Sequence, residues 1–143
     1  MFIITHDLEA ALVCDKTAIL REGKLLEFDT PHNLISSLPS NGLLARLSIE
    51  NLTGEIIDII ADFEHCEEVS RVGNDVVEVF LKDFEENLLP LIDYLLEKEV
   101  KIMAMSRDVA NFRRYFQLRI KWEEERDRLD LLKNEKAIHD LGE

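Results

Sequence analysis

A few side chains of this 143-residue chain could do chemistry, and His6 is the first of them. His6 lies in the run Ile3-Ile4-Thr5-His6-Asp7, and an imidazole in either protonation state can donate a hydrogen bond to a strong anionic acceptor. The alternative is a polar residue that simply ends a strand. Asp7 is explained by capping of the helix that follows, and Thr5 by hydrogen bonds to nearby backbone groups.

The cysteines and the remaining histidines do not predict a metal site. Cys14 and Cys66 are too few and too far apart for the paired spacing of a zinc site, and a buried free thiol behaves as a small hydrophobe. No two histidines lie three or four residues apart among His6, His32, His65 and His139. The run from His65 to Glu68 could attract a metal, but a turn after a helix explains it equally well.

Acidic side chains recur on two expected helices, at Glu55, Asp58 and Asp62 and again at Glu85, Glu86 and Asp93. Paired catalytic carboxylates need a pocket and shifted pKa values. Solvated helix faces are therefore the simpler interpretation of both groups.

Several short motifs follow His6 in order: Cys14-Asp15-Lys16, Ala18-Ile19-Leu20, Glu22-Gly23-Lys24 and Thr30-Pro31. Together with residues 3–7 this run resembles the end of the ATPase domain of an ABC transporter, over residues 2–35. The resemblance implies a switch strand, a switch histidine, a helix, a hairpin and a closing helix. It makes His6 the switch histidine, which in that family contacts the γ-phosphate of ATP in a closed dimer.

The nucleotide-binding motifs that precede the switch strand in that family are absent from the sequence. A P-loop needs G-x-x-x-x-G-K-[ST], but Gly23-Lys24 has Ala18 five places before the glycine and Leu25 after the lysine. No adjacent glycines exist for a signature loop, and no apolar strand ends in Asp-Glu. We therefore expect ATP and Mg²⁺ to act only in an intact subunit, with no cofactor, no metal and no ATPase activity for this chain alone.

The elements that must position His6 follow from local patterns. Residues 2–4 predict a buried parallel strand, and Leu8, Ala11 and Leu12 mark one face of a helix capped by Asp7. Residues 17–21 and 25–28 predict a hairpin around Glu22-Gly23-Lys24. A helix over residues 31–37 begins at Pro31 with Thr30 as its N-cap, and the turn residues 38–42 predict a domain boundary.

Beyond residue 42 the pattern predicts the order β-α-β-β-α-β. Residues 43–49 alternate as a strand, and Ile56, Ile59, Ile60 and Phe63 mark a helical face. Residues 69–72 and 76–82 predict a hairpin, with Val77, Val79 and Leu81 on one side. The second helix presents Leu88, Leu91, Ile92, Leu95 and Leu96, with Asn87 as N-cap so that Pro90 falls in its first turn, and residues 100–106 form the last strand.

This order predicts an α+β protein: a ferredoxin-like sandwich preceded by part of an ABC ATPase core and followed by a C-terminal helix. It also resembles the accessory domain that follows the ATPase core in ABC exporters of the drug and antibiotic type. The expected parts are the core segment 1–38, the ferredoxin-like domain 39–117, and the charged helix and tail 118–143.

The last expected helix covers residues 108–136, with Val109, Phe112 and Phe116 able to pack on the preceding domain. Its second half carries charges around Trp122, Leu129 and Leu132. A partner-binding helix over residues 125–132 is one interpretation, and a solvated helix with intrahelical ion pairs is the other.

Composition limits the partners. The formal net charge of −13 repels nucleic acid and anionic lipid surfaces, so neither nucleic-acid binding nor direct membrane insertion is expected. Apolar runs are too short to span a bilayer, and the first residues lack the basic start of a signal peptide. A cytoplasmic location follows, peripheral to the membrane within an intact transporter.

Two functional interpretations remain open. The first is the C-terminal part of the ATP-binding subunit of an ABC-type exporter, whose partners are the membrane-spanning subunit and a second ATP-binding subunit. The second is a non-catalytic ferredoxin-like regulatory or dimerising module that binds a protein or a small ligand. Exposed apolar surface on residues 1–42 and on the last helix predicts a homo-oligomer in either case, most simply a two-fold dimer.

Overall fold

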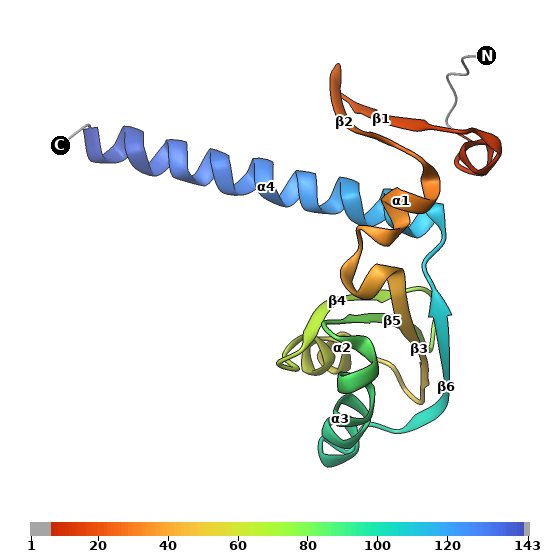
Figure 1. The fold of residues 1–143 in the computed structure, drawn as a ribbon. Coiled ribbons are helices and arrows are strands. Elements are labelled where there is room, and N and C mark those ends of the chain that lie inside the picture. The colour runs from red at the N-terminus through yellow and green to blue at the C-terminus, as the bar shows by residue number, and fades with distance from the viewer. Residues whose placement is uncertain (1–6, 142–143) are drawn as a thin grey trace.

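The computed structural model describes residues 7–141 and has a mixed α+β architecture. The described residues form two antiparallel sheets and four α-helices, as Figure 1 shows. The expected strand over residues 2–4, Thr5 and the candidate switch residue His6 lie outside the described residues, so their roles remain predictions.

The N-terminal part contains the predicted hairpin and capped helix. Strands β1 (Thr17–Arg21) and β2 (Lys24–Asp29) pair antiparallel, and both turn residues have positive φ, 51° at Glu22 and 76° at Gly23, as a type I′ turn requires. Helix α1 (Pro31–Ser36) begins as expected, with the backbone N–H of Asn33 donating to Thr30 Oγ1 at 3.1 Å.

The expected helix after Asp7 is a 3-10 turn instead, η1 (Ala10–Val13). The backbone N–H of Glu9 donates to Asp7 Oδ1 at 3.0 Å, so Asp7 does bind local backbone as a cap would. Leu12 and Val13 remain 58% and 85% exposed. With so little apolar surface buried, the segment has no packing to extend a single turn into an α-helix.

The turn residues after α1 form a second 3-10 turn, η2 (Pro39–Gly42), where Ser40 and Asn41 take left-handed backbone conformations with φ of 52° and 59°. The Ser40 hydroxyl donates to the Leu81 carbonyl at 2.6 Å and accepts from the Phe84 N–H at 3.0 Å. These bonds fix the turn against the end of the larger sheet.

The larger sheet has the strand order β4-β5-β3-β6, and each neighbouring pair is antiparallel. Its strands are β3 (Leu43–Ile49), β4 (Cys66–Arg71), β5 (Val76–Leu81) and β6 (Ile102–Val109). Helix α2 (Gly54–Ala61) joins β3 to β4, and α3 (Phe84–Glu97) joins β5 to β6. The order of elements is therefore β-α-β-β-α-β, as the pattern predicted.

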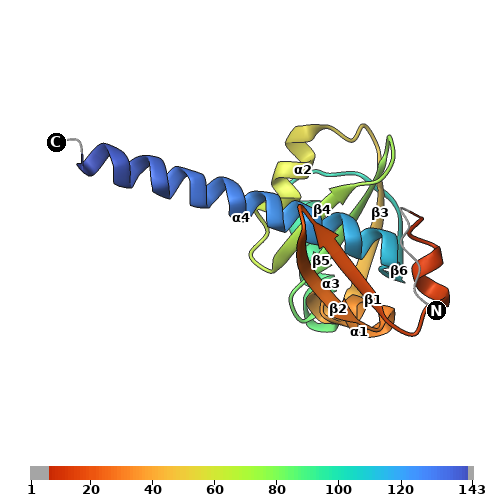
Figure 2. The same cartoon turned by 90° about the horizontal axis from the view of Figure 1, so that it is seen from above.

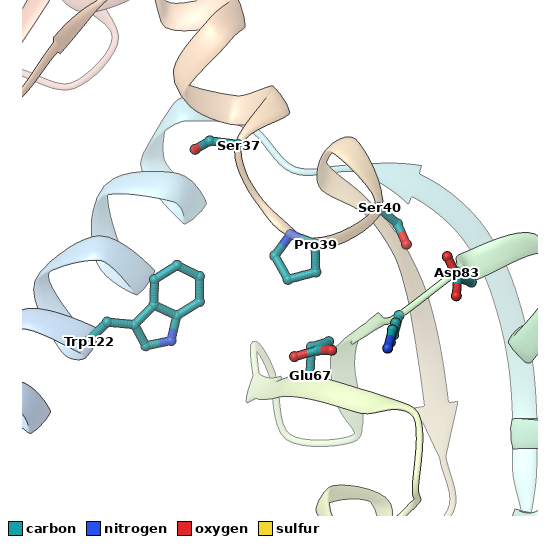
Figure 3. A pocket seen from close by; sticks show the side chains of 7 residues that line it. Ser37, Pro39, Ser40, Glu67, Asp83 and Trp122 are labelled. Carbon is teal, nitrogen blue, oxygen red and sulfur yellow. The ribbon is translucent and has the colours of Figure 1, made fainter.

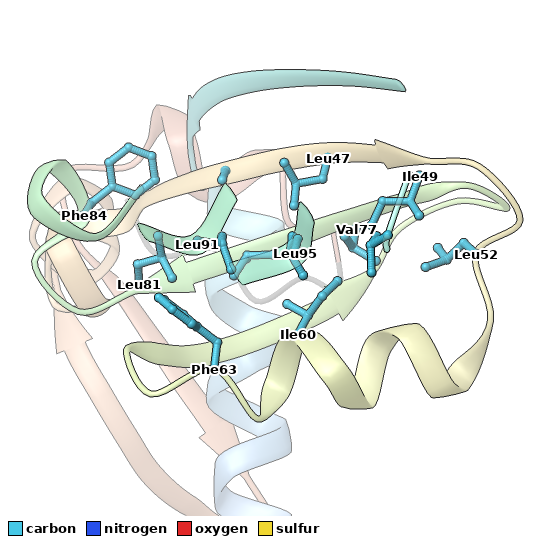
Figure 4. Close-up of a cluster of buried hydrophobic side chains, with 13 residues drawn as sticks. Leu47, Ile49, Leu52, Ile60, Phe63, Val77, Leu81, Phe84, Leu91 and Leu95 are labelled. Carbon is cyan, nitrogen blue, oxygen red and sulfur yellow. The ribbon is translucent and has the colours of Figure 1, made fainter. Parts of the chain in front are cut away.

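Helices α2 and α3 cover one face of this sheet and enclose what we call the inner core (Figure 4). Its buried members come from both helices, from alternate positions of β3 and β5 and from the loops beside them: Ala45, Leu47, Ile49, Leu52, Ile60, Phe63, Val77, Val79, Leu81, Phe84, Leu91, Leu95 and Val100. All of these side chains are apolar, so the inner core is stabilised by hydrophobic burial.

The expected N-cap at Asn87 is wrong, because α3 begins at Phe84 with Asp83 as its N-cap, four residues before the expected one. Phe84 is 2% exposed, and its burial in the inner core extends the helix backward. Pro90 therefore lies inside the helix rather than in its first turn. Asn87 instead bonds the Lys82 carbonyl through its side-chain amide, at 2.5 Å.

Helix α4 (Phe112–Leu141) crosses the opposite face of the sheet and then projects away from it (Figures 1 and 2). Together with β1, α1 and the outer face of the sheet it encloses the outer core, whose buried members are Ile19, Leu34, Leu38, Leu44, Phe80, Ala110, Phe112, Tyr115 and Leu118. The expected packing of Phe112 and Phe116 is confirmed, but Val109 ends β6 and is 55% exposed. Among residues 7–141, none of the helices combines the length and the apolar character that a membrane span needs.

Candidate functional site

The candidate site is the place where α4 passes between the hairpin and the sheet. Figure 1 shows the hairpin on one side of α4 and the four-stranded sheet on the other. Successive turns of α4 present charged or aromatic side chains to the hairpin and to the sheet. We call the group formed by Glu27, Arg119, Trp122, Glu123 and Arg126 the polar junction.

Arg119 is the centre of the polar junction. Its Nε lies 3.0 Å from Glu27 Oε1 on β2, and its Nη1 lies 2.7 Å from Glu123 Oε2 one helical turn away. Arg126 Nη2 contacts the other oxygen of Glu123 at 2.7 Å. Both carboxylate oxygens of Glu123 therefore have guanidinium partners, a charge-assisted arrangement that is stronger than a neutral hydrogen bond.

The pKa shifts at the junction follow from these contacts. The hydrogen bond from Arg119 is the main cause that holds the pKa of Glu123 below its usual value. The same bond to Glu123, followed by the one to Glu27, raises the pKa of Arg119 despite partial burial. Both shifts favour the charged forms of Glu123 and Arg119, so their contact is an ion pair rather than a proton-transfer site.

A further ion pair joins the hairpin to α4 farther out. Arg21 Nη1, at the end of β1, lies 2.7 Å from Asp127 Oδ2. This pair is more exposed than the polar junction, with Asp127 49% exposed, so it stabilises the contact less.

On the sheet side, α4 is held by two acidic residues. Glu68 of β4 accepts from Lys121 Nζ at 2.5 Å and from the Trp122 indole N–H at 3.1 Å. Glu78 of β5 is 4% exposed and pairs with Arg114 at 2.8 Å and with Arg46 at 3.3 Å. Helix α4 therefore contacts both the hairpin and the sheet through ion pairs, in addition to the outer core.

Two open cavities flank Trp122. The larger, of about 570 Å³, lies between α1, the ends of β4 and β5, and α4, and Figure 3 shows the Trp122 ring facing Pro39 and Glu67 across it. Its other lining residues are Ser37, Ser40, Lys82 and Asp83. The smaller, of about 300 Å³, is lined by the polar junction together with Ser37 and Tyr115.

The Tyr115 hydroxyl is one of two buried side-chain oxygens that lack a hydrogen-bond partner among the described residues, and Thr17 Oγ1 is the other. Tyr115 as a whole is 1% exposed. Burial is the main cause that raises its pKa, and the nearby Glu27 carboxylate adds to the shift. The Ser37 hydroxyl, which also lines the smaller cavity, donates its proton to the Leu34 carbonyl at 2.5 Å.

Among the described residues, the two acidic groups, Cys14, Cys66, His32 and His65 lie outside this junction, whereas Trp122 is part of it. The two acidic groups, on α2 and α3, remain exposed to solvent as expected. Glu85 of the second group forms an ion pair with Arg107. Within residues 7–141 no group of histidine, cysteine and acidic side chains could hold a metal ion.

Sequence reasoning missed the polar junction because Arg119 and Glu27 are 92 positions apart. A local signal was available in Glu123, which lies four residues after Arg119 and three before Arg126, the spacing of helical ion pairs. Such spacing predicts the intrahelical pairs but gives no sign that β2 joins them.

Comparison of the chain with protein families, with curated proteins and with solved structures finds no match.

Proposed function

We propose that this chain acts as the C-terminal part of the ATP-binding subunit of an ABC-type exporter. One observation above the others supports the proposal. The hairpin β1–β2 and the capped helix α1 follow residues 3–7 at the spacing that is typical of the family, and a β-α-β-β-α-β unit comes next. The proposed partners are a membrane-spanning subunit and a second ATP-binding subunit, and the proposed location is the cytoplasmic side of the membrane.

The second half of the proposal is that residues 39–117 form a ferredoxin-like accessory domain. The strand order β4-β5-β3-β6, antiparallel throughout with α2 and α3 on one face, supports this assignment. We assign this domain a structural or regulatory role in the subunit.

Exposed apolar side chains on the hairpin fit the first half of the proposal. Leu20, Leu25 and Phe28 are 62%, 60% and 59% exposed. A two-stranded hairpin that leaves this much apolar surface in water is only marginally stable unless another element covers it. In the proposed subunit the rest of the ATPase core covers it, and the contacts of α4 hold the hairpin to the accessory domain.

The proposed catalytic contribution is limited to His6, as the γ-phosphate sensor of the intact subunit, with ATP and Mg²⁺ held by motifs outside this chain. In a subunit that joins this chain to an ATPase core with a P-loop and a signature motif, His6→Ala should abolish turnover and leave nucleotide binding nearly unchanged. His32→Ala is the matched control. Near-normal turnover of the His6 variant would contradict the assignment.

The chain alone should bind Mg-ATP no tighter than about millimolar, because one imidazole supplies a single hydrogen bond where a phosphate-binding loop supplies many. Calorimetric titration decides this. Micromolar binding that is lost in His6→Ala would reveal a phosphate site that the proposal does not contain.

The second candidate is a non-catalytic regulatory or dimerising module that binds a protein or a small ligand. The exposed strand β6 at the sheet edge favours it, since an unpaired edge is a template for another chain. A reading frame upstream of Met1 that encodes a P-loop and a signature motif would support the exporter subunit, and its absence would support this second candidate.

A further inference from the structure

The β6 side of the larger sheet is an open edge. Strand β6 pairs only with β3 among the described residues, and residues 103–109 are all exposed. Met103 is 65% exposed and Met105 is 47% exposed. An exposed strand of eight residues with apolar side chains is the kind of edge that proteins usually cover or interrupt.

One flank of α3 extends this apolar surface. Glu85, Leu89, Ile92 and Leu96 follow the spacing i, i+4, i+7, i+11, which places them on one side of the helix. Because Glu85 Oε1 lies 2.5 Å from Arg107 Nη1, that side faces β6. Leu89 and Leu96 are 72% and 59% exposed. We call Leu89, Leu96, Met103 and Met105, together with the outer backbone groups of β6, the edge patch.

The backbone of β6 shows which of its groups point outward. The Ala110 N–H donates inward to the Gly42 carbonyl at 2.8 Å, so the N–H groups of the odd-numbered residues before it point away from β3. The Val109 N–H is satisfied by the side chain of Asp108 at 2.8 Å. The N–H groups of Met105 and Arg107 have no such partner among the described residues.

Charge distinguishes this edge from the rest of the molecule. The chain carries a net charge of −13, yet the local charge at this edge is close to zero. The cations Lys98, Lys101 and Arg107, with Arg46 beside them, are balanced by Glu99, Asp108 and the ion-pair partners Glu50 and Glu85. Two copies of so acidic a chain repel each other generally, and they approach with least repulsion where the local charge is close to zero or positive.

We propose that the edge patch binds a second copy of this chain, with the two β6 strands antiparallel about a two-fold axis at Met105. This register sets Met105 against itself and Arg107 against Met103 of the second copy, whereas centring on Ala104 or Arg107 would oppose like charges. Leu89 and Leu96 of both copies cover the methionines. The same patch serves both copies, as a two-fold contact requires.

The contact is expected to be reversible. The proposed contact uses one strand and one flank of a helix from each copy. These supply fewer residues than the roughly 20 to 30 per partner of a standard interface. The proposal is independent of ATP binding and of the upstream reading frame, so either can fail without the other.

Cross-linking tests the geometry. In a Cys14→Ala, Cys66→Ala background, Met105→Cys should form a disulfide-linked dimer on mild oxidation, because opposed residues of a hydrogen-bonded antiparallel pair lie about 5.5 Å apart between Cα atoms, within disulfide range. Leu20→Cys on the hairpin and Leu132→Cys on α4 are the controls for the other exposed apolar surfaces. Faster cross-linking at either control position, or none at Met105→Cys, would overturn the proposal.

Sedimentation tests the affinity. Met105→Lys and Leu89→Lys each place a charge in the patch and should weaken dimerisation at least about tenfold, while Leu131→Lys on the projecting part of α4 should leave it unchanged. Circular dichroism checks that each variant folds, and the two patch variants lie on different elements, so one remains informative if the other does not fold. A wild-type chain that stays monomeric up to about 1 mM would contradict the proposal.

Discussion

The two faces of the larger sheet are covered in different ways. The inner core, under α2 and α3, is entirely apolar, and its residues lie within residues 45–100. The outer core draws on residues from Ile19 to Leu118 and is surrounded by ion pairs to Glu27, Glu68 and Glu78. One face of the sheet is thus covered by helices that are near it in sequence. The other face is covered by distant segments whose position is fixed by ion pairs.

The largest predicted effect is in the inner core. Leu95→Asp should leave the chain unfolded, because Leu95 is fully buried and an unpaired carboxylate there costs several kcal/mol. Ile60→Asp, on α2, should do the same. Leu96→Asp is the matched control, since Leu96 is the next residue and is 59% exposed. Urea denaturation followed by circular dichroism measures all three, and a stably folded Leu95→Asp chain would contradict the inner core as described.

The next effect is on the outer face. Glu78→Ala removes the buried carboxylate between Arg114 and Arg46 and should reduce the free energy of unfolding by about 2 kcal/mol. The loss is smaller than for Leu95→Asp because Arg46 is half-exposed and regains water. Glu97→Ala, an exposed residue at the end of α3, is the control. Equal stability of the two variants would show that Glu78 does not hold α4.

These two faces also separate what the sequence predicts from what it does not. The inner core follows from the alternation of Val77, Val79 and Leu81 and from the helical spacing of Ile56, Ile59 and Ile60, which are local patterns. The hairpin turn and the Thr30 cap follow from local chemistry in the same way. The order β-α-β-β-α-β was therefore predictable.

The outer face was not predictable, because its contacts depend on where α4 passes. Nothing near Glu27 indicates that Arg119 lies beside it, and the charged stretch after Trp122 fits a solvated helix equally well. The start of α3 was mispredicted for a similar reason: Pro90 and Asn87 favour a later start, but burial of Phe84 in the tertiary structure outweighs that local preference.

Alkaline pH should lower the free energy of unfolding by a smaller amount, through Cys66, which packs against the inner core. Burial is the main cause that raises the pKa of the Cys66 thiol to about 11 from 9.0. The unfolded thiol ionises first as pH rises, so the stability that the neutral thiol contributes is complete below pH 9 and is lost between pH 9 and 11. After allowance for partial exposure, this amounts to about 1 kcal/mol. Cys66→Ala should remove this part of the alkaline loss in urea titrations at pH 8 and pH 11.

The smallest predicted change in stability is at Tyr115, and it is a gain rather than a loss. The buried hydroxyl has no partner among the described residues, so Tyr115→Phe removes an unmet hydrogen bond and keeps the ring. The variant should be as stable as the wild type or more stable, by up to about 1 kcal/mol. Tyr115→Ala, the control, should lose about 3 kcal/mol through the cavity it leaves. A clear loss in Tyr115→Phe would mean that the hydroxyl has a partner in solution.

The central claim about this molecule is that ion pairs from α4 hold the hairpin to the rest of it. Hydrogen exchange of the wild type and of Arg119→Gln, followed by mass spectrometry, tests this claim most directly, because Arg119 is the residue that joins Glu27 of the hairpin to α4. We expect the amides of β1 and β2 to exchange at least about tenfold faster in the variant, while those of β3 and β5 keep the wild-type rate. Unchanged protection of the hairpin, or an equal loss across hairpin and sheet, would contradict the claim.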